Sequence, residues 1–254
     1  MRSTSHSRRQ FVKNTLAGAG LLSLPNLLNA QNAGPVEKKK IVCVGAHPDD
    51  PESGCGGTLL LLSKAGHEVT VMYLTTGERG IVGKNLIDAS DIRRQEAINA
   101  CAILKAKPVF AGQIDGDTIV NNAWIKKMSE MIAAEKPDIV FSHWPVDSHI
   151  DHQVSSLLVS QAWLRAKPKF ALYFFEVCIG EQSMIFHPTD YIDITEVQEL
   201  KKQAVYCHIS QDPPGIYNCG HASMEDFRGR EISVKAAEAF VRMNGRTQGG
   251  LQIK

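Results

Sequence analysis

Residues 41–57 read IVCVGAHPDDPESGCGG, and this stretch decides the expected fold. Its first part is apolar without strict alternation, which is typical of a strand buried on both faces of a parallel sheet. The apolar run ends in His47, Asp49 and Asp50. An imidazole and a carboxylate three positions apart can reach one metal ion together, and the neighbouring carboxylate is left free to act on a bound water. The stretch therefore predicts a catalytic metal site at the carboxyl end of the first strand.

Short apolar runs alternate with helical stretches from residue 40 onward. Strands are expected at 41–46, 68–74, 108–111, 139–142 and 171–177, and helices at 57–65, 90–105, 124–135, 153–165 and 197–210. This alternation predicts an α/β fold with a Rossmann-like, mostly parallel sheet and helices on both faces. In such sheets, ligand sites gather at the carboxyl ends of the strands.

A second cluster of metal-capable side chains follows the strand expected at 139–142. Its members are His143, His149, Asp151 and His152. Both clusters, together with the polar residues 75–80, follow strands and are expected on the same rim of the sheet. A catalytic zinc site usually has three protein ligands and one open position, so the second cluster is expected to supply the third ligand.

Structural alternatives exist for these residues. His47, Asp49 and Asp50 could cap a helix beside a turn proline, although three metal-type residues within four positions are unusual for a cap. His149 and His152 could be surface residues at the start of a helix. Three further histidines are expected outside the set of ligands. His143 is expected to be a structural residue or pocket wall, and His208 and His221 lack a matching partner pattern. Because a polar loop is expected at 212–221, His221 is left open as a residue that lines the pocket.

Length and charge limit the class of protein. The chain has 254 residues, of which 43% are hydrophobic and 22% charged, enough for one domain at 40–254 with a full core. The formal net charge is +1, and residues 1–30 contribute four basic residues and no acid. Without them, 24 basic residues stand against 27 acidic ones, a balance of −3. No polycationic nucleic-acid surface is indicated.

Residues 1–30 are expected to be an export signal, followed by a linker at 31–39. The segment SRRQFVK precedes an apolar run at 16–28 that is too short and too interrupted for a membrane span. It resembles a twin-arginine signal, with Val12 in place of the usual Leu. Cleavage after Ala30 or Ala33 and a periplasmic or extracellular bacterial location are expected. An uncleaved amphipathic N-terminus is the alternative.

Six cysteines follow this segment: Cys43, Cys55, Cys101, Cys178, Cys207 and Cys219. None forms a Cys-x-x-Cys pair, so most are expected to be small core residues. Cys207 and Cys219 flank a turn-rich segment, and a bridge between them is left open because spacing alone does not establish one.

Several of these motifs together resemble one family, the zinc-dependent PIG-L/LmbE-like deacetylases of N-acetylglucosamine compounds. The matching residues are AHPDD at 46–50, 54–58, TGE at 76–78, 93–97 and HIDH at 149–152. Two positions depart from the family pattern. Ile150 stands where proline is usual, and Pro51 separates Glu52 from the two aspartates. Neither departure touches an expected ligand.

The resemblance implies roles for the residues of the first motif and for the end of the second. His47, Asp50 and His152 would be the zinc ligands, and Asp49 would be the general base. Zinc lowers the pKa of a bound water from about 15.7 to about 7, which gives amide hydrolysis its nucleophile at neutral pH. Loss of Asp49 should then leave metal binding largely intact, whereas loss of a ligand should remove the metal.

Supporting roles follow from the same resemblance. His149 would stabilise the oxyanion or, when charged, give a proton to the leaving amine. Arg93 matches an arginine that binds substrate oxygens, with Arg94 as the alternative assignment. Asp151 is expected to orient His149 or a ligand histidine through a hydrogen bond.

The function implied is removal of the N-acetyl group from an N-acetylglucosamine-type sugar or conjugate, with zinc as cofactor and iron or another divalent ion as alternatives. The partner is then a small-molecule sugar, and a homo-oligomer is left open. An amidase acting on another acyl amide, or a non-catalytic exported carbohydrate- or metal-binding protein, are the alternatives. A dinucleotide-dependent enzyme is disfavoured because the first strand runs into Gly45-Ala46-His47 rather than Gly-x-Gly-x-x-Gly.

Overall fold

The computed structural model describes residues 37–167, 169–177 and 182–243. Its strands form one seven-stranded sheet in the order β3-β2-β1-β4-β5-β7-β6. The strands are β1 (Lys40–Gly45), β2 (Glu68–Tyr73), β3 (Lys107–Phe110), β4 (Ile139–His143), β5 (Ala171–Phe175), β6 (Asp190–Asp193) and β7 (Ala237–Arg242). β3, β2, β1, β4 and β5 are parallel, and β7 is antiparallel to both of its neighbours. The predicted α/β class with a mostly parallel sheet is confirmed.

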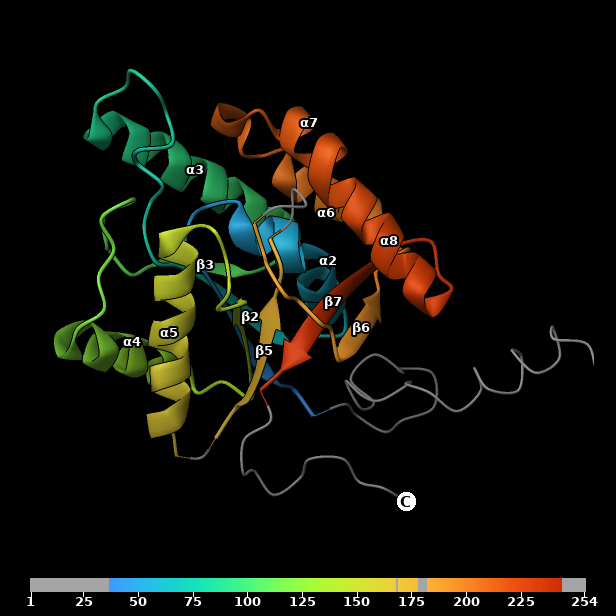
Figure 1. Cartoon of the computed structure of the whole chain (residues 1–254), viewed down its shortest axis with the longest axis horizontal. Helices are drawn as coiled ribbons and strands as arrows, with labels where there is room; N and C mark the ends of the chain where they lie inside the picture. Colours follow the sequence, from blue (N-terminus) through green and yellow to red (C-terminus); the bar gives the residue numbers. More distant parts are fainter. Residues whose placement is uncertain (1–36, 168, 178–181, 244–254) are drawn as a thin grey trace, which may run out of the picture.

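Helices cover both faces of the sheet (Figure 1). The helical segments are α2 (Asp50–Lys64), α3 (Leu86–Leu104), α4 (Asn122–Glu135), α5 (Ile150–Arg165), α6 (Gln198–Val205), η2 (Ile209–Gln211), α7 (Pro213–Ile216), η3 (Tyr217–His221) and α8 (Ala222–Ile232). Side chains of β1 alternate between two cores. Ile41 and Cys43 pack with residues of α2, α3 and α6, whereas Val42 and Val44 pack with residues of α4 and α5. Burial on both faces accounts for the unbroken apolar run in the sequence.

The chain reverses its direction of winding at β1. β1 pairs with β2 on one side and with β4 on the other, so the crevice beyond its carboxyl end is a switch point, where α/β sheets bind ligands. β1 ends at Gly45, where an added Cβ would lie 2.6 Å from the ring of Pro51. The glycine therefore lets the first turn of α2 approach the strand end closely.

Helix α2 begins at Asp50, seven residues before the expected start at 57. Pro51 lies in its first turn, where a missing N–H does no harm. The C-terminal part differs more from expectation. The polar loop expected at 212–221 is wrong, because that segment forms α7 and the π-helical turn η3, and α8 follows. Strands β6 and β7 were not predicted.

Some expectations fall on residues outside the described part of the chain. These are the export signal at 1–30, most of the linker at 31–39, both cleavage positions and Cys178. The five described cysteines are free, with Cys43, Cys55 and Cys101 buried, so Cys207 and Cys219 do not pair in this structure. Within the described ranges, no helix combines the length and the apolar character that crossing a membrane requires.

Candidate metal centre

Three predicted ligands meet at the carboxyl end of β1. His47 comes from the turn between β1 and α2, Asp50 is the first residue of α2, and His152 lies in the first turn of α5. Asp50 Oδ2 lies 3.2 Å from His47 Nδ1, and Asp50 Oδ1 lies 3.3 Å from His152 Nε2. Two ligand atoms on one tetrahedral zinc ion are about 3.4 Å apart when each metal–ligand bond is about 2.1 Å. Each of the two imidazoles therefore lies beside one oxygen of Asp50 at the spacing that two ligands of one ion have.

His143 also reaches Asp50, but its lone pair is used elsewhere. Its Nε2 accepts a hydrogen bond of 2.9 Å from the backbone N–H of Ala46, and the ring is fully buried. A nitrogen that accepts this bond has no electron pair left for a metal. His143 therefore lies beneath the centre as a support, as the sequence suggested.

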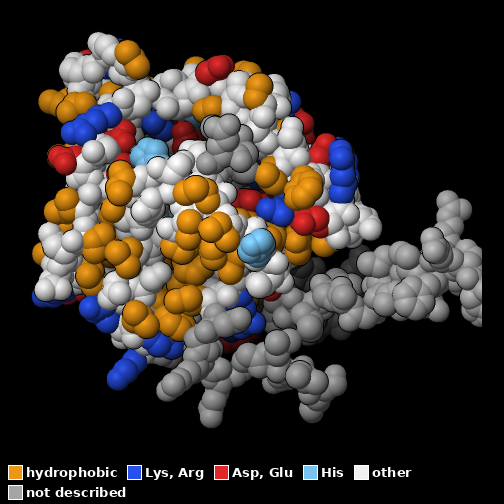
Figure 2. Space-filling view, in the orientation of Figure 1, with side chains coloured by type: hydrophobic (Ala, Val, Ile, Leu, Met, Phe, Trp, Pro, Cys, Tyr) orange, Lys and Arg blue, Asp and Glu red, His pale blue; other side chains and the backbone are white. Residues whose placement is uncertain are grey.

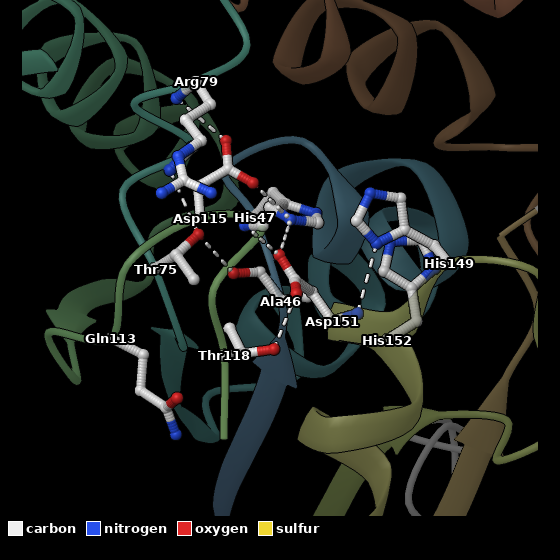
Figure 3. Close-up of polar contacts among 12 residues, drawn as sticks. Ala46, His47, Thr75, Arg79, Gln113, Asp115, Thr118, His149, Asp151 and His152 are labelled. Carbon is white, nitrogen blue, oxygen red and sulfur yellow. Dashed lines mark hydrogen bonds and ion pairs between the residues drawn. The ribbon is translucent and has the colours of Figure 1, made fainter.

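Two carboxylates hold the far nitrogen of His47 (Figure 3). Its Nε2 lies 3.0 Å from Asp151 Oδ2 and 3.2 Å from Asp115 Oδ1. Asp151 also accepts hydrogen bonds from Gly116 N and Thr118 Oγ1. These contacts assign the proton of His47 to Nε2 and leave Nδ1 facing Asp50. Asp151 thus contacts His47 rather than the side chain of His149.

A third carboxylate stands behind His152. Asp147 Oδ1 lies 3.1 Å from His152 Nδ1 and accepts a hydrogen bond of 2.8 Å from the backbone N–H of His149. Asp147 is buried in the loop between β4 and α5. Each predicted imidazole ligand therefore has its second nitrogen beside a carboxylate, an arrangement typical of zinc-binding histidines.

Asp49 lies next to the ligands in a constrained conformation. Its φ is 105°, a left-handed value that is strained for a side-chain-bearing residue. Arg93, from α3, donates to Asp49 Oδ2 at 2.9 Å and also to the carbonyl oxygens of Pro48 and Gly77. Arg93 is only 3% exposed, so its guanidinium is engaged with the protein and not open to solvent.

His149 caps α5 at the edge of the centre. Its Nδ1 accepts a hydrogen bond of 3.2 Å from the backbone N–H of Asp151. The proton of the neutral ring is then on Nε2. The ring centroid lies 4.8 Å from that of His47 and 4.7 Å from that of His152. His149 therefore brings an N–H donor to the same small region.

The buried charges of the centre call for a cation. Burial alone would raise the pKa of Asp50, but the charge of His152 outweighs it and holds that pKa well below its usual value. Burial likewise would lower the pKa of His47, but Asp115, Asp151 and Asp50 raise it well above the usual value. The raised pKa of His47 shows that these buried acids favour a positive charge beside them. A divalent cation supplies the same charge, so the residues present fit a metal ion.

A cavity of about 330 Å³ opens onto the centre. It is lined by His47, Asp49, Asp50, Arg93, His149 and His152, among others. In the space-filling view, a histidine lies in a hollow between acidic and basic side chains (Figure 2). A larger groove between α4 and α5 contains none of the predicted site residues.

Residues 42–163 match the family model described as PIG-L, GlcNAc-PI de-N-acetylase. The chain contains a PIG-L family domain. All the predicted ligands, Asp49, Arg93 and the pair His149 and Asp151 lie within the matched residues, whereas α6 to β7 lie beyond them.

Relatives of the PIG-L domain carry different names. The chain is 28% identical to a diacetylchitobiose deacetylase of Thermococcus kodakarensis over 194 residues, covering 70% of this chain and 72% of that protein. It is 27% identical to a 4-oxalmesaconate hydratase of Pseudomonas putida over 207 residues, covering 74% of this chain and 80% of that protein. The structure of an N,N'-diacetylchitobiose deacetylase from Pyrococcus horikoshii superposes with a TM-score of 0.74 over 95% of each chain, at 22% identity. That likeness shows the fold.

Sequence reasoning missed two acids of the PIG-L domain. Asp115 follows β3 on the same rim as the other clusters, so its position after a strand was an available signal. Asp147 lies only two residues before His149. The polar loop expected around His221 is wrong, because His221 is buried in η3, but its position on the cavity wall agrees with the alternative that it lines the pocket. His208 lies apart from the ligands, with Nε2 3.6 Å from Glu52 Oε2.

Proposed function

We propose that this PIG-L domain is a metal-dependent hydrolase that removes the N-acetyl group from an N-acetylglucosamine-type sugar or conjugate. The observation that carries the proposal is the placement of Asp49 on the cavity wall beside a set of two imidazoles and one carboxylate. His47, Asp50 and His152 would hold the ion, and zinc is the metal that this donor set favours. The family model and the diacetylchitobiose deacetylase relative support the reaction class.

When bound, a zinc ion supplies Lewis-acid chemistry and lowers the pKa of a coordinated water to about 7. The protein supplies the proton transfers. Burial raises the pKa of Asp49, although Arg93 opposes the rise, so its carboxylate is a better proton acceptor than an ordinary aspartate. Asp49 takes one proton as the water oxygen bonds to the acetyl carbon. The C–N bond then breaks as Asp49 returns this proton to the amine nitrogen. The free amino sugar leaves together with acetic acid, which releases its proton to solvent as acetate forms.

His149 is suited to the oxygen that gains negative charge when water adds to the amide. Its Nε2–H faces the region of the ligands because Nδ1 is occupied by the backbone N–H of Asp151. One such donor stabilises a developing oxyanion by about 3 kcal/mol. Protonating Nδ1 would break the bond that caps α5, so the neutral donor role is favoured over the role of a charged acid.

A hydratase is the second candidate, because the 27% identical relative from Pseudomonas putida has that name. Adding water to a carbon–carbon double bond also needs a positioned water and a base, so the same residues would serve. The charge of the cavity favours the deacetylase. Among the described residues that line it, Arg93 is the one Lys or Arg, and its guanidinium is bound to Asp49. An oxalmesaconate-type substrate carries several carboxylates.

The test is acetate release from N-acetylglucosamine and its conjugates by the zinc-loaded protein, beside Asp49→Asn with the same measured metal content. Loss of the general base is expected to lower turnover by about 10²- to 10⁴-fold without loss of metal. Acetate release that is unchanged in Asp49→Asn would contradict the role of Asp49. No acetate from any amide, together with water addition to an unsaturated carboxylic acid, would move the hydratase ahead.

A further inference from the structure

One side of the cavity comes from the chain beyond the metal centre. Its residues are Gln182, Gln211, Ile216 and His221, here called the C-terminal wall. The last three end η2, α7 and η3 in turn. Because none of these side chains belongs to the ligand set or carries a fixed charge, the wall is a candidate surface for the part of the substrate beyond the acetamido group.

His221 has unused hydrogen-bonding capacity. It is 4% exposed and makes no hydrogen bond to any residue that the structure describes, yet it lines the cavity. Burial lowers the pKa of His221 to about 4, so the ring is neutral near pH 7. A neutral imidazole offers one N–H donor and one nitrogen acceptor. It can therefore pair with a hydroxyl group in either direction.

Gln211 lines the cavity and has an unused acceptor oxygen. Its Nε2 donates to the carbonyl oxygen of Gly80 and to Ser210 Oγ, each at 3.1 Å. The Gly80 carbonyl can only accept, so it fixes which end of the amide is nitrogen. Oε1 remains to accept a hydrogen bond. An acceptor suits a hydroxyl group and repels a carboxylate or phosphate.

The charge balance of the cavity also disfavours an anionic group. Asp49, Asp50 and Asp115 line it with three carboxylates, against one guanidinium from Arg93. A divalent ion would bring the positive charges to three and balance the acids. No positive charge among the described lining residues is then left for an anionic group attached to the sugar.

Buried contacts hold the wall in place. Tyr217, four residues before His221, donates a hydrogen bond of 2.9 Å to Glu225 Oε2. The other oxygen of Glu225 lies 2.8 Å from the ammonium of Lys201, which is 1% exposed. This network fixes η3 against α6 and α8, so His221 is positioned before any substrate arrives.

We propose that the C-terminal wall binds an uncharged, hydroxyl-bearing group joined to the acetamido sugar, such as a second sugar ring, and discriminates against an anionic one. The inference rests on the proposed deacetylase function and narrows its substrate class. Gln211 and His221 are the residues that favour the uncharged group over the anionic one.

The test compares three substrates of the zinc-loaded protein: free N-acetylglucosamine, a neutral N-acetylglucosamine disaccharide, and the same disaccharide with the second ring oxidised to a uronate. We expect kcat/KM for the neutral disaccharide to exceed that for the uronate by about tenfold or more. Equal turnover of the two disaccharides, or preference for the uronate, would overturn the proposal.

Variants of the wall sharpen the test. Gln211→Arg adds a cation and is expected to reduce the preference for the neutral disaccharide about tenfold, while Gln95→Arg adds the same charge on the exposed side of α3 and should leave it unchanged. His221→Ala should lower the preference for the neutral disaccharide over free N-acetylglucosamine, and His221→Gln should retain part of it. Preferences in both His221 variants that equal the wild type would contradict the role of His221, and thermal unfolding checks that each variant is folded.

Failure of the proposed deacetylase function can be told apart from failure of the proposal for the C-terminal wall. If none of the three substrates releases acetate, the deacetylase function is wrong. Calorimetric binding of the two disaccharides to zinc-loaded Asp49→Asn then still decides the wall proposal, because tighter binding of the neutral disaccharide supports it and equal or weaker binding overturns it.

Discussion

The guanidinium of Arg93 lies 2.9 Å from the carboxylate of Asp49, and both side chains are largely buried on the wall of the cavity. The pair links α3 to the strained turn before α2, where Asp49 has a φ of 105°. Arg93 also binds the carbonyl oxygens of Pro48 and Gly77. Arg93 therefore holds Asp49, the proposed base, in position and stabilises its negative charge. The substrate-binding role expected from the sequence did not include this contact.

Replacing Arg93 by Ala is expected to lower both stability and turnover. It leaves the partly buried Asp49 carboxylate and two carbonyl groups without their donor. Removing one partner of a fully buried ion pair costs about 3–5 kcal/mol, and the 21% exposure of Asp49 places the expected loss toward the lower end. Urea unfolding measures the first effect, and acetate release measures the second. Arg94→Ala is the matched control. Arg94 stacks 4.4 Å above the ring of Phe110, so its loss should cost about 1 kcal/mol or less. If Arg93→Ala and Arg94→Ala lose the same stability and the same turnover, the conclusion that Arg93 holds Asp49 is contradicted.

Metal removal should destabilise the fold measurably. An ion that binds only the folded state adds about 2.7 kcal/mol when its free concentration is a hundred times its Kd. Zinc addition should therefore raise the Tm of the chelator-treated protein. In His152→Ala this rise is expected to disappear, because a ligand on α5 is lost. If zinc raises the Tm of His152→Ala as much as that of the wild type, the ion binds at a site that does not include His152.

Asp151→Asn tests the carboxylate that orients His47. Asp151 accepts from Gly116 N, Thr118 Oγ1 and His47 Nε2, and Asn offers one acceptor oxygen in place of two. Loss of such a supporting group typically weakens metal binding by 10- to 100-fold, and we expect a change in this range. A competition titration with a zinc chelator measures it. Asp117→Asn, at a side chain 69% exposed in the same loop, should bind zinc as the wild type does.

The parts of the structure that the sequence predicted are those with strong local patterns. The strand at residues 41–46 and the clusters that contain His47 and His152 follow from an apolar run that ends in metal-type residues. Their meeting at one edge follows from parallel strand direction. Asp147 was missed because only the folded loop turns it behind His152, and local spacing does not report that contact.

The C-terminal segment shows why the rest was not predictable. Pro213, Pro214 and Gly215 usually interrupt helices, so this part read as a loop. In the structure, the two prolines occupy the first turn of α7, where prolines are tolerated, and the chain continues through η3. Tyr217 and Glu225 secure this path through a buried bond whose partners are eight residues apart. Tertiary packing therefore overrode the local turn signal.

Lys201 is a buried cation between two acids. Its ammonium lies 2.8 Å from Glu225 Oε1 and 2.7 Å from Glu238 Oε1. Glu238 also accepts hydrogen bonds from the backbone N–H groups of Gly57 and Thr58, so the network joins α2, α6, α8 and β7. Burial alone would raise the pKa of Glu225, but Lys201 outweighs it and lowers that pKa. Burial alone would lower the pKa of Lys201, but Glu225 and Glu238 raise it.

The signs of these shifts define a pH window. A lowered Glu225 pKa stabilises the fold above about pH 4.5, and this contribution is lost as the pH falls through the folded pKa. A raised Lys201 pKa stabilises the fold below about pH 10.5 and is lost as the pH rises through the folded pKa. Between these limits, both contributions are present and stability from this network should not depend on pH.

Lys201→Met should make the stability of the fold depend on pH between these limits. It leaves two buried carboxylates without their cation, which is expected to cost about 3–5 kcal/mol near pH 8. Burial then dominates at Glu225 and raises its folded pKa above the unfolded value, so protonation at lower pH relieves the penalty. The variant should therefore lose less stability at pH 5.5 than at pH 8, as measured by urea unfolding. Lys126→Met, at a side chain 74% exposed, should show no such dependence. A penalty in Lys201→Met that stays constant over this range would mean that the network carries no buried charge.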